Sequence, residues 1–117
     1  AVLPDMIRRK RGSIFNILSN AAVKTFEGSS AYTATKAGLL GLGRVLREEL
    51  RTRDVRVHNI LPGATDTAMW SPSDRKKHRP RMMSPSGVAA AVVSAYLMPP
   101  DVVVDEMVIR PITGDIG

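Results

Sequence analysis

Apolar and polar positions between residues 30 and 52 recur with the period of an amphipathic helix. The apolar positions are Leu39, Leu42, Val45, Leu46 and Leu50, and the charged side chains between and beside them are Arg47, Glu48, Glu49 and Arg51. This spacing predicts a helix with one face toward a core. Shorter helices are predicted over residues 2–10, closed by Gly12, and over residues 84–97, where Ser-Pro supplies the N-cap and the first helical residue.

Three short apolar runs bounded by turn residues predict β-strands over residues 13–18, 55–61 and 102–109, of which the first is expected to be buried. Residues 64–83 are polar, with scattered Met and a single Trp, and predict a long loop. Because strands and helices alternate along the chain, the sequence predicts an α/β fold with a parallel sheet.

Three glycines lie inside the long helix, and each costs about 1 kcal/mol relative to Ala. Ala34, Gly38, Gly41 and Val45 fall on or near one stripe of this helix. The helix is therefore expected to pack closely along that stripe against a sheet or another helix, and a subunit interface is compatible with it.

The composition is that of one globular domain with its own core, at 117 residues and 44% hydrophobic content. No apolar run approaches the roughly eighteen residues that span a membrane, so no membrane association is expected. The lack of cysteine excludes disulfides and agrees with a cytoplasmic protein. Two distant histidines without acidic neighbours do not indicate a metal site.

The net charge of +6 raises the question of nucleic-acid binding. Basic residues gather at positions 8–11 and 75–81, but aromatic residues make up only 4% of the chain, so platforms for stacked bases are scarce. Solvated basic segments explain both clusters better, the first at a helix C-terminus where cations complement the helix dipole. We expect no nucleic-acid partner.

The stretch SSAYTATKAGLLGLG places Tyr32 and Lys36 four residues apart on one helical face. There the ammonium favours the phenolate form of the tyrosine, so the pair is a small acid–base device. Ser19, thirteen residues before Tyr32 at the end of an apolar run, adds a hydroxyl to orient a substrate oxygen. Each residue taken singly also has an ordinary interpretation, as a half-buried helix tyrosine, a solvated lysine and a serine that ends a strand.

Other polar and apolar side chains have similar alternatives. His58 lies in the middle of a predicted strand and is expected to be packed rather than catalytic, whereas His78 is expected to be solvated. Trp70, with the methionines around it, either lines a substrate pocket or packs within its own loop.

The segments GSIFNILS, YTATK and VRVHNILPGATDT, in this order and over nearly the whole chain, resemble the short-chain dehydrogenase/reductase family. The resemblance implies a Rossmann-like, doubly wound NAD(P)-binding fold and hydride transfer between a nicotinamide and a carbonyl or alcohol. Tyr32 would donate or accept the proton and contact the cofactor, and Lys36 would tune Tyr32 and bind the nicotinamide ribose. Ser19 would hold the substrate oxygen.

The same resemblance implies further contacts with the cofactor. Pro62 and Gly63 would bring backbone close to the nicotinamide, and the backbone of Ala64 and Thr65 with the Thr67 hydroxyl would meet its carboxamide. On the residues alone, Pro62-Gly63 and Thr67 are equally a strand-ending turn and a turn hydroxyl.

The family's glycine-rich T-G-x-x-x-G-x-G turn and its cofactor-selecting residue are missing, so residues 1–117 resemble a single partial domain, the C-terminal catalytic half. The choice between NAD and NADP and the identity of the substrate therefore do not follow from the sequence. Alone, the chain is expected to bind nicotinamide weakly and to associate through the unpaired edge of strand 13–18. A homo-oligomer is expected. The alternatives from other classes are a noncatalytic α/β interaction module and, less favoured, a basic nucleic-acid-binding domain.

Overall fold

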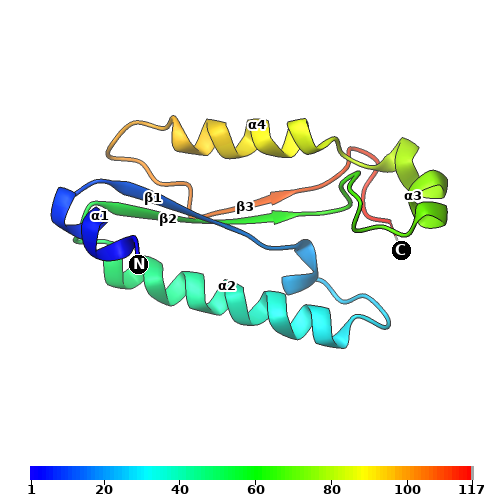
Figure 1. Ribbon diagram of the computed structural model, residues 1–117, viewed down its shortest axis with the longest axis horizontal. Helices are drawn as coiled ribbons and strands as arrows, with labels where there is room; N and C mark the ends of the chain where they lie inside the picture. Colours follow the sequence, from blue (N-terminus) through cyan, green and yellow to red (C-terminus); the bar gives the residue numbers. More distant parts are fainter. Residues whose placement is uncertain (117) are drawn as a thin grey trace.

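The computed structural model describes residues 1–116 and has the predicted α/β architecture with a parallel sheet (Figure 1). The three strands are β1 (Gly12–Ile17), β2 (Val55–Pro62) and β3 (Glu106–Ile109), paired in that order. Helix α2 (Ser30–Leu50) lies along one face of the sheet, and α4 (Pro85–Tyr96) lies on the other. The shorter elements are α1 (Leu3–Arg9), the 3-10 turn η1 (Asn20–Ala22), α3 (Pro72–His78) and the 3-10 turn η2 (Arg79–Arg81).

Helix α2 is fixed to the sheet by apolar contacts at two places. Leu40 packs with Leu18 and Leu61, and near the end of the helix Leu50 packs with Val55 and Val57. These contacts align α2 antiparallel to the strands. The N-terminus of α2 therefore lies at the edge of the sheet where the strands end (Figure 1).

Between those contacts the sheet presents a polar row under α2. Asn16, Asn59 and Glu106 occupy one cross-strand row, in which Asn16 donates to Asn59 Oδ1 at 3.0 Å and Asn59 donates to Glu106 at 3.4 Å. Gly43 crosses directly above. A Cβ at Gly43 would lie 2.8 Å from Asn16 Nδ2 and closer still to Asn59 Oδ1. Glycine therefore permits the close approach of helix and sheet here.

The predicted packing of the small-residue stripe is wrong for this chain. A Cβ at Gly38 or Gly41 would have no heavy atom within 4 Å, and Val45 is exposed. The stripe faces away from the sheet because Leu40 and Gly43 define the packed face. The interpretation of the stripe as a subunit interface stays a prediction.

Two further elements differ from the sequence prediction between β2 and the end of the chain. Residues 64–83 are not one loop, because they contain α3 and η2. Ser71 Oγ accepts a hydrogen bond from Asp74 N at 3.2 Å and so caps α3. Strand β3 begins at Glu106 rather than at residue 102. The carbonyl of Val102 instead accepts a hydrogen bond from Arg56, which also binds the carbonyls of Tyr96 and Met98.

The N-terminal elements differ in detail. Helix α1 is closed by Lys10 in the left-handed conformation, with φ of 52°, and not by Gly12, which begins β1. Strand β1 is half-buried rather than buried, and Ile17 is exposed, because β1 is an edge of the sheet. Within residues 1–116, no helix is long and apolar enough to cross a membrane.

His58 is packed as predicted. Its ring is fully buried and stacks on Phe15 with centroids 4.2 Å apart, and Nδ1 lies 2.8 Å from the carbonyl oxygen of Val104. Burial lowers the pKa of His58, although the Val104 carbonyl opposes that shift. The ring is thus a neutral part of the core.

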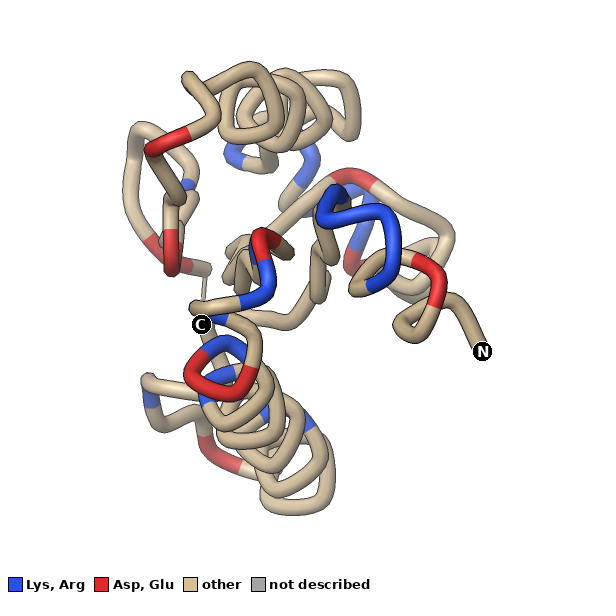
Figure 2. Tube along the Cα trace, turned by 90° about the vertical axis from the view of Figure 1, so that its left-hand side faces the viewer, with Lys and Arg blue, Asp and Glu red and all other residues tan. Residues whose placement is uncertain are grey.

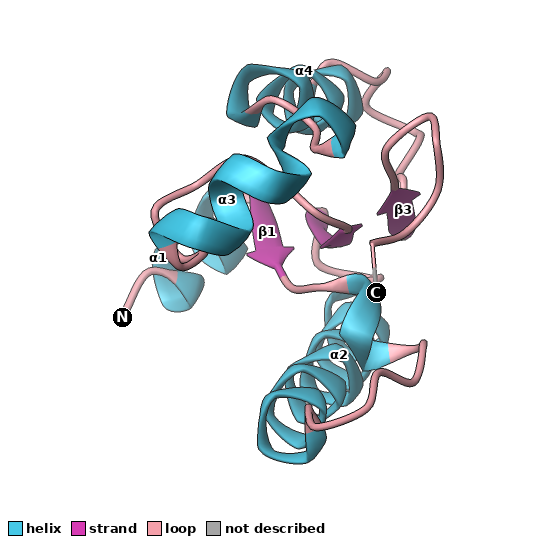
Figure 3. Cartoon of the chain, turned by 90° about the vertical axis from the view of Figure 1, so that its right-hand side faces the viewer, coloured by secondary structure: helices cyan, strands magenta, loops and turns pink. Residues whose placement is uncertain are grey.

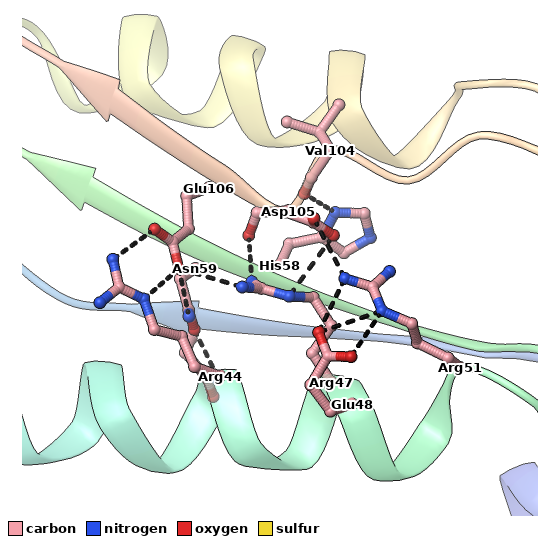
Figure 4. A network of polar contacts seen from close by, with 10 residues as sticks. Arg44, Arg47, Glu48, Arg51, His58, Asn59, Val104, Asp105 and Glu106 are labelled. Atoms are coloured by element: carbon pink, nitrogen blue, oxygen red, sulfur yellow. Dashed lines mark hydrogen bonds and ion pairs between the residues drawn. The ribbon is translucent and has the colours of Figure 1, made fainter.

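Ion pairs connect α2 to β3 beside the polar row (Figure 4). Arg44 donates to both carboxylate oxygens of Glu106, at 2.8 and 2.7 Å. Arg47 lies 3.3 Å from Glu106 and donates to the carbonyl of Asp105 at 3.1 Å. The hydrogen bonds from Arg44 lower the pKa of Glu106 to about 2, against desolvation, with help from Asn59.

This shift predicts a pH-dependent contribution to stability. Because the folded pKa of Glu106 lies below its unfolded value of about 4.5, the contribution is complete above that value and disappears as the pH falls toward 2. We expect Glu106→Gln to lower the free energy of unfolding by about 1–2 kcal/mol at pH 7, allowing for solvent screening. Urea denaturation between pH 7 and pH 3 measures the difference, which should shrink below pH 4.5.

Glu49→Gln is the matched control, because Glu49 is exposed and makes no ion pair within the part of the chain that the structure describes. It should leave the stability unchanged within about 0.5 kcal/mol. A Glu106→Gln difference that stays constant down to pH 3 would contradict the assignment.

Candidate active site

The residues predicted to be functional gather at one edge of the sheet. In a parallel sheet all carboxyl ends meet at the same edge, and ligands of open α/β sheets bind there. Ser19 lies just after β1, and residues 62–67 comprise the last residue of β2 and the segment after it. Helix α2 begins close by, with Tyr32 and Lys36 in its first turns. Figure 3 looks onto this edge, which α3 flanks.

Ser19 has a defined place directly after β1. The backbone N–H of Leu18 donates to Ile60 at 2.8 Å, and Ser19 then takes an extended conformation as the N-cap of η1. Its Oγ accepts from Ala21 N at 3.1 Å, and the residue is 8% exposed. Because the hydroxyl acts as an acceptor in this bond, its proton is available for a second partner.

Tyr32 and Lys36 lie together as their spacing predicts. Lys36 Nζ is 5.6 Å from the centroid of the Tyr32 ring, within the range of a cation–π contact. Tyr32 is 41% exposed. One turn further along α2, Leu40 packs on Leu18, the residue before Ser19. The tyrosine and lysine thus project from the first turns of α2 at the edge to which Ser19 belongs.

The segment after β2 brings backbone close to the residue next to Ser19. Gly63 N donates to Ile109 O at 2.7 Å, and a Cβ at Gly63 would lie 3.3 Å from Asn20 Nδ2 and 3.3 Å from Pro111 Cδ. Within residues 1–116, the N–H groups of Ala64 and Thr65 donate no hydrogen bond.

The hydroxyls of this segment make local bonds. Thr65 Oγ1 donates to Gly63 O at 3.0 Å, and Thr67 Oγ1 accepts from Met69 N at 3.4 Å. Trp70 Nε1 donates to Thr65 O at 3.0 Å, so the indole is fastened to the segment. The Thr67 hydroxyl keeps its own proton for another acceptor.

Helix α3 is tied to this segment by Asp66. Arg75 Nε donates to Asp66 at 2.5 Å, and Arg79 Nε lies 2.9 Å from the other carboxylate oxygen. These pairs, chiefly the hydrogen bond from Arg75, lower the pKa of Asp66. The sequence predicts that the basic cluster at 75–81 is a solvated loop. This prediction is wrong, because Arg75 and Arg79 bind Asp66 and anchor a helix beside the site.

Two polar residues at this edge have no role in the sequence interpretation. Asn20, directly after Ser19, donates to Asp115 at 2.8 Å, and the Asp115 side chain is only 5% exposed. The hydrogen bond from Lys24, with the charges of Lys24 and Arg110, lowers the pKa of Asp115. No local pattern joins residues that are 95 positions apart.

A hollow of about 1230 Å³ lies at the opposite, amino edge of the sheet and is separate from these residues. Figure 2 looks onto that edge. Its walls are basic, but Arg51 pairs with Glu48, and Arg56 binds backbone carbonyls. Lys10 and Arg11 also line this hollow, and within residues 1–116 their side chains make no ion pair.

Comparison with known proteins identifies the family. The sequence profile of the short chain dehydrogenase family matches residues 1–78. The chain is 43% identical over 116 residues to sepiapterin reductase of Chlorobaculum tepidum, covering 99% of this chain and 47% of that protein. It is 36% identical over 115 residues to an uncharacterized oxidoreductase of Staphylococcus aureus, covering 96% of this chain and 48% of that protein.

Comparison with solved structures leads to the same family assignment. The closed form of serine dehydrogenase complexed with NADP⁺ superposes with a TM-score of 0.86 at 30% identity, over 98% of this chain and 50% of that one. A metagenomic short-chain oxidoreductase in complex with NADP gives a TM-score of 0.72 at 32% identity, over 93% of this chain and 42% of that one. The chain belongs to the short-chain dehydrogenase family, and it spans about half the length of these relatives.

Proposed function

We propose that residues 1–117 form the C-terminal, catalytic half of an NAD(P)-dependent oxidoreductase that interconverts a carbonyl and an alcohol. The main support is that the Tyr32–Lys36 pair, the Ser19 turn and the backbone after Gly63 share one sheet edge in a chain of this family. Two of the solved relatives are bound to NADP, which favours NADP as the cofactor.

In the proposed reduction, the substrate carbonyl lies between the Ser19 hydroxyl and the Tyr32 phenol. A bound nicotinamide would supply the hydride to the carbonyl carbon. Tyr32 gives its proton to the oxygen, so that the C=O double bond becomes a C–O single bond with one new C–H bond and one new O–H bond. Ser19 donates a hydrogen bond to the same oxygen while negative charge develops there. In the oxidation, Tyr32 takes the proton back.

Lys36 has two roles in the proposed reaction. Its ammonium, beside the Tyr32 ring, stabilises the phenolate that is left when the proton has moved. It would also donate to the nicotinamide ribose. The free N–H groups of Ala64 and Thr65, with the Thr67 hydroxyl, would hold the carboxamide, and Pro62-Gly63 would set the approach of the backbone.

The experiment uses the intact protein that contains this chain. NADPH or NADH carrying deuterium at the transferable position is incubated with a panel of ketones and aldehydes, and the alcohols are analysed by mass spectrometry. The proposal expects one deuterium on the carbinol carbon of at least one product. If the protein folds and binds the cofactor but deuterium is never transferred to any carbonyl, the noncatalytic interaction module is the better account.

One observation also supports a homo-oligomer. The face of α2 turned away from the sheet is apolar and exposed at Leu42 and Val45, and a Cβ at Gly38 or Gly41 would meet no other atom of the described chain within 4 Å. Such a face is suited to a second helix.

A further inference from the structure

The segment after β3 returns across the carboxyl edge and reaches the turn that carries Ser19 (Figures 1 and 3). Its Asp115 carboxylate is held from three directions. Asn20 Nδ2 donates to Oδ1 at 2.8 Å, Lys24 Nζ pairs with Oδ2, and Arg110 Nη1 lies 3.5 Å from Oδ2. We name these four residues, Asp115, Asn20, Lys24 and Arg110, the Asp115 clasp.

Asn20 connects the Asp115 clasp to the candidate site. It follows Ser19 in the chain and is 8% exposed. The amide nitrogen that binds Asp115 also lies where a Cβ on Gly63 would be only 3.3 Å away. The carbonyl of Asn20 accepts from the backbone N–H of Lys24 at 2.9 Å. The Asn20 amide thus connects Asp115 to the residue next to Ser19 and to the place where the Gly63 backbone passes closely.

We propose that Asp115 is a positioning residue that acts through Asn20 to fix the Ser19 hydroxyl relative to the Gly63 backbone. This inference rests on the function proposed above. A carboxylate suits the place, because Asn20 presents a donor and two cations approach the same group. Without that negative charge, the Lys24 ammonium and the Arg110 guanidinium would repel each other. A displacement of a reacting group by about 1 Å lowers a rate by as much as 10²-fold.

The test is a charge swap in the intact protein, measured with the carbonyl substrate found by deuterium transfer. Asn20→Asp places two carboxylates together, and Asp115→Ala removes the clasp. Each is expected to lower kcat about 10-fold or more. In the double variant Asn20→Asp/Asp115→Asn, the introduced amide donates to the introduced carboxylate, and one negative charge still faces Lys24 and Arg110. We expect kcat to return to within about threefold of the parent value.

Asp101→Asn is the matched control, because Asp101 is exposed and lines the hollow at the opposite edge. It should leave kcat unchanged. Melting temperatures and amide exchange over residues 19–24 are measured on all variants. If the clasp variants melt earlier but keep the parent kcat, or if the double variant is no better than Asn20→Asp, the inference is wrong.

Tyr32→Phe, assayed in parallel, separates this outcome from failure of the proposed function. An inactive Tyr32→Phe enzyme with a normal kcat for Asp115→Ala overturns only the clasp. A fully active Tyr32→Phe enzyme overturns the proposed function and the inference that rests on it.

Discussion

Replacing Tyr32 by Phe in the intact protein is expected to lower kcat by about 10²–10⁴-fold, because it removes the only proton that the proposed reaction transfers from the protein. The ring remains, so its contact with Lys36 and the start of α2 are kept. The melting temperature and the dissociation constant for the cofactor should change little. Steady-state kinetics, a thermal melt and a cofactor titration measure the three quantities on one preparation.

Tyr96→Phe is the natural control for this experiment. Tyr96 is the last residue of α4 and is half exposed, on the other side of the sheet from Tyr32 (Figure 1). The same loss of a phenolic hydroxyl there should leave kcat unchanged. An active Tyr32→Phe variant, or an equal loss in both variants, would contradict the assignment of Tyr32 as the proton donor.

The second large effect concerns the contact between α2 and the polar row. Gly43→Ala is expected to destabilise the protein by about 1–3 kcal/mol, because the added methyl group overlaps the amide groups of Asn16 and Asn59. Their mutual hydrogen bond would also be strained. Urea denaturation of the intact protein measures the change in the free energy of unfolding.

Gly38→Ala, on the same helix, is the matched control and should have the opposite sign. Within the protomer nothing lies within 4 Å of a Cβ at Gly38, so in a monomeric preparation the substitution should gain up to about 1 kcal/mol of helix propensity. If the two substitutions changed the free energy of unfolding equally, the close approach of Gly43 to the sheet would not be the cause of the destabilisation.

The two glycines also show what the sequence could not predict. Gly38 and Gly43 both lie inside α2. The spacing of the small residues favours Gly38 and Gly41, and not Gly43, as the packed positions. The packed face is decided instead by where Leu40 and Leu50 meet the apolar residues of the sheet. That choice depends on contacts between residues distant in the sequence, which a helical periodicity does not contain.

Features that depend on neighbouring residues were predicted better than contacts between distant residues. The parallel sheet, the long helix and the cap at Ser84 followed from periodicity and cap residues, and Ser84 Oγ does accept from Gly87 N at 3.0 Å. Ser71 is a cap residue of the same kind, but the polar composition of residues 64–83 indicates a loop, so α3 does not follow from the sequence pattern.

At the candidate site, the sequence predicted the residue types and their order, and the resemblance supplied their roles. The spacing of Tyr32 and Lys36 is local, so their contact was predictable. The bond between Asn20 and Asp115 was not, because it joins the turn after β1 to the segment after β3. Long-range polar contacts of this kind are visible only when the fold has brought the segments together.

In the proposed mechanism, one substrate oxygen is bound by two hydroxyls, those of Ser19 and Tyr32. A crystal structure of the intact protein with oxidised cofactor and an unreactive alcohol or ketone analogue tests it directly. The account predicts that the analogue oxygen lies about 2.6–3.2 Å from both Ser19 Oγ and the phenolic oxygen of Tyr32. An analogue bound with its oxygen beyond hydrogen-bonding reach of either hydroxyl would contradict the account.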